Sequence, residues 1–199
     1  MTLGDEVPQL VAETFKNPQA AARRLIAKRV PAQAVWLGLA LVSVMSLMVL
    51  QLSLVAVGDG QMLNPAGTAF RQPVTGTIFQ AFSILLIAVV MTFTGRVFGG
   101  KGRFMEALLL VVWLEFILTV LAGVQLVALL AIPVVGLILS VLAIPLFIWL
   151  LVSFTATVHG FQNLLLVLLG LIGVFFLTAV ALAIVLVALG IDPNLLTQV

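Results

Sequence analysis

One apolar segment of the chain, residues 104–157, reads FMEALLLVVWLEFILTVLAGVQLVALLAIPVVGLILSVLAIPLFIWLLVSFTAT. Glu106 and Glu115 are its only charged residues. As a single helix it would be about 80 Å long at 1.5 Å per residue, more than twice the thickness of a bilayer's hydrocarbon core. A stretch this apolar and this long is therefore expected to fold back on itself within a membrane.

The turn within this stretch is predicted from the polar and helix-breaking residues near its middle. Gln125, Pro133 and Gly136 are the markers that the sequence offers there. They place two transmembrane helices at about 104–125 and 134–157. Each segment has the roughly 20 residues that a helix needs to cross the hydrocarbon.

The rest of the chain shows the same alternation of long apolar runs and short polar connections. Turn-forming residues at 58–60 and glycines and cations at 99–103 separate the runs. In chain order we expect a polar N-terminal segment at 1–31, spans at 32–57, 74–98, 104–125, 134–157 and 163–189, and a short tail at 190–199. The predicted fold is therefore an all-α, polytopic transmembrane bundle of about five helices.

The composition supports the membrane assignment and excludes several classes of protein. Of the 199 residues 63% are apolar and 8% are charged, whereas soluble domains carry about 25% charged residues. The chain has no cysteine, which excludes disulfides, thiolate metal sites and iron–sulfur clusters. We expect no cofactor and no metal. The basic residues flank apolar runs, so neither nucleic acid nor nucleotide is an expected partner.

The distribution of lysine and arginine predicts the topology. One group lies in the N-terminal segment and a second lies between spans two and three, whereas the loop between spans one and two holds only Arg71. By the positive-inside rule the N-terminus is cytoplasmic and the C-terminus is outside. Seven of these cations are the candidates for contact with lipid headgroups: Arg23, Arg24, Lys28, Arg29, Arg96, Lys101 and Arg103.

The N-terminal segment is expected to contain a basic helix at 18–30. Asn17 and Pro18 are typical of a helix start, with Asn as the cap and Pro in the first turn. Ala22, Leu25 and Ile26 form an apolar strip between the cations. Such a helix tends to lie in the headgroup plane; the alternative is a plain cytoplasmic stop signal without a docked helix.

Glu115 is the intramembrane polar candidate, about 17 Å into span three by helical rise. Because an ionised carboxylate in hydrocarbon costs about 2.5–3.5 kcal/mol, it should be protonated or paired. One interpretation is a proton relay or a ligand contact. The other is a single interhelical hydrogen bond to a partner such as Gln51, Gln80 or Gln125.

His159, the sole histidine, is predicted to lie at the cytoplasmic end of span four as an interfacial polar residue. One histidine without cysteine or clustered carboxylates makes a poor metal site. Residues 95–101 match the first part of a phosphate-binding loop, but Gly102 replaces the required Ser or Thr and a membrane span precedes the loop. No catalytic set is present, so an enzyme is not expected.

Several short motifs together resemble the YIP-one (Ypt-interacting protein) family, in a bacterial form. They are Phe15-Lys16-Asn17-Pro18, Arg23-Arg24-Leu25, residues 98–104 reading FGGKGRF, Ala107-Leu108-Leu109 with Trp113, and His159-Gly160-Phe161. The resemblance implies a five-helix bundle with a cytoplasmic N-terminus. Eukaryotic relatives contact Rab-type GTPases and carry an Asp-Leu-Tyr-Gly-Pro motif. This chain lacks that motif, so GTPase binding is not carried over.

The leading hypothesis is a non-enzymatic integral membrane protein that acts as a scaffold, assembly factor or accessory subunit. It would act through helix packing and contact with membrane lipids, other membrane proteins or copies of itself, in the cytoplasmic (inner) membrane of a bacterium. One alternative is a small transporter or channel that uses Glu115. Another is a lipid-binding or membrane-shaping module that uses residues 18–30 and 96–103.

Overall fold

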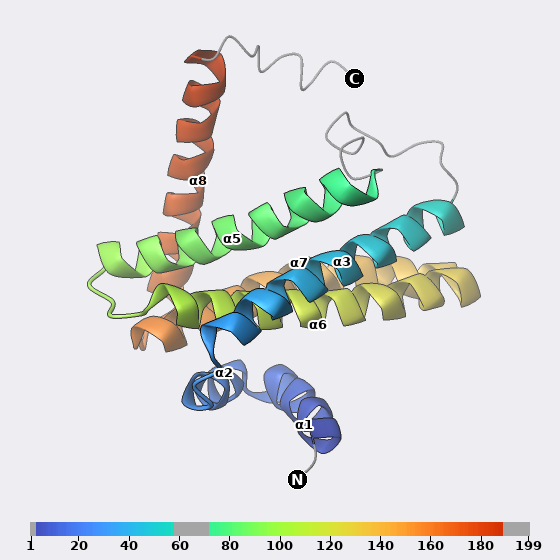
Figure 1. The fold of residues 1–199 in the computed structure, drawn as a ribbon, viewed down its shortest axis with the longest axis horizontal. Coiled ribbons are helices and arrows are strands. Elements are labelled where there is room, and N and C mark those ends of the chain that lie inside the picture. Colours follow the sequence, from blue (N-terminus) through green and yellow to red (C-terminus); the bar gives the residue numbers. More distant parts are fainter. Residues whose placement is uncertain (1–2, 58–71, 189–199) are drawn as a thin grey trace.

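The computed structural model describes residues 3–57 and 72–188, and every regular element in these ranges is a helix (Figure 1). The helices are α1 (Leu3–Lys16), α2 (Pro18–Ala27), α3 (Ala32–Val57), α5 (Pro73–Val97), α6 (Phe104–Ala131), α7 (Pro133–His159) and α8 (Leu164–Ala188). The predicted turn residues at 58–71, among them Asp59 and Arg71, and the predicted tail at 190–199 lie outside the described residues.

Five of the described helices, namely α3, α5, α6, α7 and α8, are long and apolar enough to cross a membrane. Inside hydrocarbon no water is available to the backbone, so each crossing segment must satisfy its own peptide groups as a helix. Many large apolar side chains on these helices remain exposed, including Leu37, Val141 and Phe175. Lipid is the solvent that suits this surface, and the protein is an integral membrane protein with an all-helical fold, as predicted.

Helix α6 is the centre of the bundle and packs against α3, α5 and α7. Its fully buried side chains include Leu108, Leu110, Leu114 and Ile117. The four helices run lengthwise beside one another in Figure 1, with α3 and α6 starting at the end where α5 and α7 finish. That end also carries residues 96–103, and we call it the basic end.

The turn between α6 and α7 is tighter than the sequence suggested. We expected the first helix to end near Gln125, but α6 continues to Ala131 and α7 begins at Pro133. The Gln125 side chain does not break the helix because its Nε2 donates to the Leu139 carbonyl of α7, at 3.0 Å. A Cβ at Gly136 would lie 2.6 Å from Leu129 Cα, so glycine lets the two helices nearly touch.

Helix α8 packs differently from the other four long helices. It leaves the basic end after Gly160, a left-handed residue with φ 76° that turns the chain. In Figure 1 it stands across the bundle at a steep angle. Val167, Leu171 and Val174 in its first half are buried, and it packs against α5 and α7. The described side chains beyond this first half are mostly exposed.

The N-terminal segment forms a two-helix cap on the basic end. Helix α2 begins as predicted: Pro18 stands in the first turn and the Asn17 side chain accepts a hydrogen bond from the Ala20 N–H at 3.0 Å. Most of its apolar strip faces protein, however, because α2 packs against α7 and α6 and buries Ala22 and Leu25, while Ile26 stays partly exposed. Protein therefore covers most of the strip that we expected in the headgroup plane.

Helix α1 was not expected from the sequence. It is short and contains Pro8, yet it buries Leu10 and Thr14 completely or nearly so. The Thr14 Oγ1 donates to the Leu10 carbonyl at 2.7 Å and accepts from Trp113 Nε1 of α6 at 3.0 Å. Trp113 thus fastens α1 to the bundle.

Candidate functional site

The structure brings the predicted headgroup residues together at the basic end. Arg23, Arg24, Lys28 and Arg29 lie on α2 or directly after it, Arg96 lies in the last turn of α5, and Lys101 and Arg103 lie in the connection to α6. All of them are exposed except Arg24, which is partly buried. Their gathering creates a strongly positive surface at the level where the apolar helices begin and end.

Two of these cations are engaged by α1 rather than free for lipid. Arg24 Nη1 lies 3.1 Å from Glu13 Oε2, and the Lys28 ammonium is paired with the Glu6 carboxylate. The hydrogen bond and the charge of Lys28 lower the pKa of Glu6 below its ordinary value. Sequence reasoning missed these pairs because it did not anticipate α1, which supplies both carboxylates.

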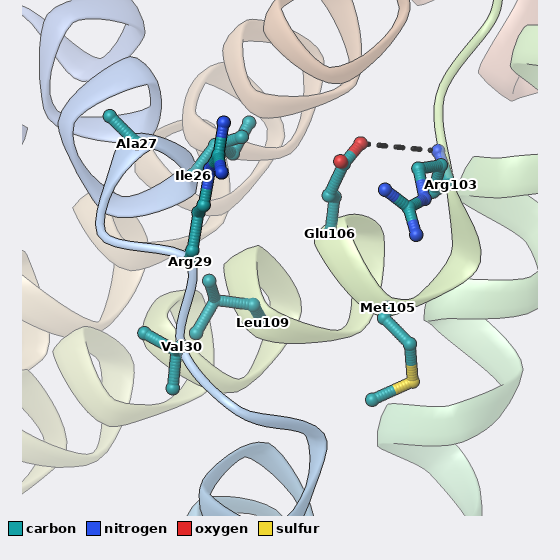
Figure 2. A pocket seen from close by; sticks show the side chains of 8 residues that line it. All are labelled: Ile26, Ala27, Arg29, Val30, Arg103, Met105, Glu106 and Leu109. Atoms are coloured by element: carbon teal, nitrogen blue, oxygen red, sulfur yellow. Dashed lines mark hydrogen bonds between the residues drawn. The ribbon is translucent and has the colours of Figure 1, made fainter.

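A groove opens between the end of α2 and the start of α6. It has a volume of about 720 Å³ and is lined by Ile26, Ala27, Arg29, Val30, Arg103, Met105, Glu106 and Leu109. Figure 2 shows Arg29 on one wall and Arg103 on the other, with the Glu106 carboxylate between them. The dashed line there is the hydrogen bond from the Arg103 backbone N–H to Glu106 Oε2, 3.3 Å long.

The local chain path explains why both arginines reach this groove. Arg29 has a left-handed backbone with φ 47°, which reverses the chain between α2 and α3. Glu106 occupies the third position of α6, where its carboxylate caps the helix start. Helix α6 therefore begins with Arg103 and Glu106 held beside each other and facing the α2–α3 connection.

His159 lies at the basic end as predicted, but it is buried in protein with 7% exposure rather than placed at an open interface. Its Nδ1 accepts a hydrogen bond from the Gly102 N–H at 3.1 Å. A Cβ at Gly95, Gly100 or Gly102 would lie 2.2, 2.5 or 2.6 Å from an atom of this side chain. We call these three glycines the glycine cage.

The glycine cage gives the residues of the phosphate-loop-like segment a structural role. Gly95 stands in the last turn of α5, so a helix rather than a strand precedes the loop. The Gly102 N–H, which a phosphate loop would offer to an anion, is already donated to His159. Phe161 stacks on the imidazole at 5.8 Å between ring centroids. The loop is shaped around an imidazole ring.

Glu115 lies among polar groups from three helices. Its Oε1 accepts from Gln80 Nε2 of α5 at 2.7 Å and from Ser46 Oγ of α3 at 2.7 Å. Ser46 Oγ also lies within hydrogen-bond distance of Thr119 Oγ1, which is 2.8 Å from the Glu115 carbonyl, so the two hydroxyl protons serve two of these three contacts at a time. Gln80 is one of the three glutamines that we named from the sequence, whereas Gln125 bonds to α7 instead.

Within the described ranges no group of three or more histidine, cysteine, aspartate or glutamate side chains is placed to hold a metal ion. Three sets of described polar side chains are candidates for a function: the groove with Arg29 and Arg103, the His159 contact and the Glu115 cluster. The His159 contact and the Glu115 cluster connect helices to one another. Of these three sets, only the groove presents exposed charged side chains.

Comparison with known proteins adds the family. The Yip1 domain profile matches residues 12–187, which is most of the chain. The match covers all five long apolar helices and ends one residue before the end of α8. No curated protein and no solved structure matches the chain significantly. Because the profile spans nearly the entire helical region, this integral membrane protein belongs to the Yip1 domain family.

Proposed function

We propose that this protein is a non-enzymatic membrane scaffold or accessory subunit, and that the basic end is its working surface. The observation that supports the proposal is the cap formed by α1 and α2. Its inner face is buried against α6 and α7, and its ion pairs join α1 to α2. A cap built this way presents a defined outer surface to another protein or to lipid headgroups.

The proposed orientation places the basic end in the cytoplasm. The described cations of α2, α5 and the connection to α6 all lie at that end, which is the pattern of cytoplasmic ends. With five crossings the C-terminus would be outside. We further propose the cytoplasmic membrane of a bacterium, which is the setting implied by the resemblance of residues 15–18, 98–104 and 159–161 to a bacterial form of the family.

The test is partner capture that depends on the cap. Full-length protein is crosslinked in membranes, purified in mild detergent and analysed by mass spectrometry. Trp113→Phe keeps an aromatic ring but removes the donor that fastens Thr14. Trp149→Phe, at a partly exposed position of α7, is the matched control.

The expected result is a stoichiometric partner, or a second copy of the chain, that is crosslinked through α1 or α2. Trp113→Phe should weaken its capture, and Trp149→Phe should leave it unchanged. A monomer that yields no crosslink from the cap would contradict the proposal. So would a partner bound equally well by both variants and crosslinked only elsewhere.

A second candidate, a small transporter or channel, draws on the Glu115 cluster. The carboxylate is partly buried among α3, α5 and α6 and receives two donors on one oxygen. This network supports a fastening role, because both donors come from neighbouring helices. Flux measurements in proteoliposomes with Glu115→Gln separate the two roles: flux that is lost while folding is retained would favour transport.

A further inference from the structure

We propose that the groove between Ile26–Val30 and Arg103–Leu109 binds the headgroup of an aminophospholipid, with its phosphate on Arg29 and Arg103 and its ammonium on Glu106. This inference deepens the lipid-contact part of the proposed function and rests on it. Three features of the molecule support it: the position of the groove, the charges that remain unpaired around it and the placement of one carboxylate.

The groove lies at the depth where headgroups are found. One wall directly precedes α3, which begins at Ala32, and the other wall is the first turn of α6, which begins at Phe104. Both helices are candidate membrane spans. The boundary between hydrocarbon and headgroups therefore falls at the groove.

The lining is amphipathic in the way that a phospholipid requires. Val30, Met105 and Leu109 supply apolar contacts on the side toward the spans, while Arg29 and Arg103 are exposed. Acyl chains next to the glycerol can pack on the apolar lining. Guanidinium groups bind phosphate oxygens through paired hydrogen bonds, which an ammonium group cannot match in geometry.

The two arginines of the groove differ from Arg24 and Lys28 in their charge partners. Arg24 and Lys28 are held by carboxylates of α1. Among the described residues, neither Arg29 nor Arg103 forms an ion pair with a carboxylate. A phosphate group would supply the missing counter-charge.

Glu106 is what makes the groove selective. The Glu106 carboxylate repels the phosphate of a lipid, so it weakens the binding of a headgroup that carries only negative charge. Its bond to the Arg103 N–H uses Oε2 alone, so the carboxylate keeps acceptor capacity for another donor. A primary ammonium donates hydrogen bonds to it, whereas a trimethylammonium has no N–H to donate.

The charges therefore match phosphatidylethanolamine better than phosphatidylglycerol or phosphatidylcholine. Two cations and one anion line the groove, and the headgroup offers one anion and one cation in return. Phosphatidylglycerol offers Glu106 neutral hydroxyl donors but no cation. Phosphatidylcholine places a bulky group without a donor against it.

The test measures which lipid stays bound. Full-length protein is reconstituted in vesicles with equal amounts of the three phospholipids and released in mild detergent, and retained lipids are counted by native mass spectrometry. We expect phosphatidylethanolamine to exceed phosphatidylglycerol by about tenfold, the scale of one charge-assisted hydrogen bond. Equal retention of the two lipids would overturn the proposal.

Three variants locate the effect. Glu106→Gln keeps an oxygen to cap α6 and should abolish the preference for phosphatidylethanolamine without reducing total lipid retention. Arg29→Gln and Arg103→Gln should each reduce the retention of every phospholipid. Lys16→Gln is the control, because Lys16 is an exposed cation at the end of α1 and does not line the groove. An unchanged preference in Glu106→Gln, or a Lys16→Gln effect equal to that of Arg29→Gln, would contradict the assignment.

A soluble competitor distinguishes a membrane lipid from a soluble ligand with the same headgroup. Glycerophosphoethanolamine should fail to displace the retained lipid at millimolar concentration, because it lacks acyl chains. Efficient displacement would overturn the lipid assignment. Partner capture through α1 and α2 is measured separately. If capture is observed but the protein shows no lipid selectivity, the lipid proposal is refuted and the proposed function is not.

Discussion

Replacing Gly95 by alanine should destabilise the protein, because His159 already occupies the space that the new methyl group needs. A Cβ at Gly95 would lie 2.2 Å from the Cδ2, Cε1 and Nε2 atoms of that ring. Contacts between carbon atoms are most favourable at about 3.5–4.0 Å, so the ring or α5 must move by more than about 1 Å. The ring has little room to move, because Gly100 and Gly102 bound it as well.

The magnitude follows from two costs and one gain. Overpacking a filled site costs about 1–3 kcal/mol. Displacing the ring breaks the bond from the Gly102 N–H to Nδ1, and a buried donor left without a partner costs about 1–3 kcal/mol. Alanine is favoured over glycine within a helix by about 1 kcal/mol. The net destabilisation is therefore about 1–5 kcal/mol on these terms.

The assay is unfolding of the purified protein in detergent, with two matched variants. Gly123→Ala on α6 meets no atom within 4 Å and should be neutral or slightly stabilising. His159→Ala removes the obstructing ring, so Gly95→Ala added to that background should cost nothing. This pair forms a double-mutant cycle. The reasoning is refuted if Gly95→Ala is as stable as Gly123→Ala, or if its cost persists without the imidazole.

Three further predictions concern other contacts of the structure. Gly136→Ala should open the α6–α7 hairpin and cost more than Gly123→Ala in the same unfolding assay, because its Cβ would meet Leu129 backbone atoms, which cannot rotate away; equal stability of the two variants would contradict this. Glu115→Gln keeps an acceptor for Gln80 and should stay within about 1 kcal/mol of wild type, whereas Glu115→Leu leaves its donors unmet and should cost about 1–3 kcal/mol more in thermal unfolding; equal loss in both would show that the charge matters instead. Because the pKa of Glu6 is depressed, its ion pair stabilises α1 fully above pH 4.5, the ordinary pKa of the group, and the stabilisation fades as pH falls from there through the lower folded-state pKa. The hydrogen-exchange rate of α1, relative to the intrinsic rate at the same pH, should rise over that window. A Glu6→Gln protein with the same pH dependence would refute the role of this carboxylate.

Hydropathy alone predicted the five long apolar helices, because hydrocarbon permits a crossing segment to satisfy its backbone in few ways. The predicted starts at Ala32 and Phe104 agree with α3 and α6. The start of α2 was predictable from the local sequence, because Asn17 and Pro18 stabilise only the first turn of that helix. The hydrogen bond of Glu115 to Gln80 was also foreseeable, because a polar group in lipid needs a partner.

The errors in the prediction share one physical cause, which is contact between segments distant in the sequence. Gln125 was taken as a turn marker, yet its amide finds the Leu139 carbonyl across a helix pair that exists only after folding. The strip of α2 that includes Ala22 packs against α6 and α7, and its apolar character alone does not distinguish such a contact from contact with lipid. Helix α1 was overlooked because its stability depends on Trp113 and on the cations of α2.

That this is a helical membrane protein, and where most of its apolar helices begin, thus follows from the order of residues, since those properties depend on transfer of short segments into hydrocarbon. Which cations stay unpaired, what the cage glycines surround and how α8 leaves the bundle are set by the packing of the helices. Charge pairing and close packing depend on distances between helices, and one-dimensional hydropathy carries no information about them. The groove with Arg29, Arg103 and Glu106 exists for that reason only in the folded chain.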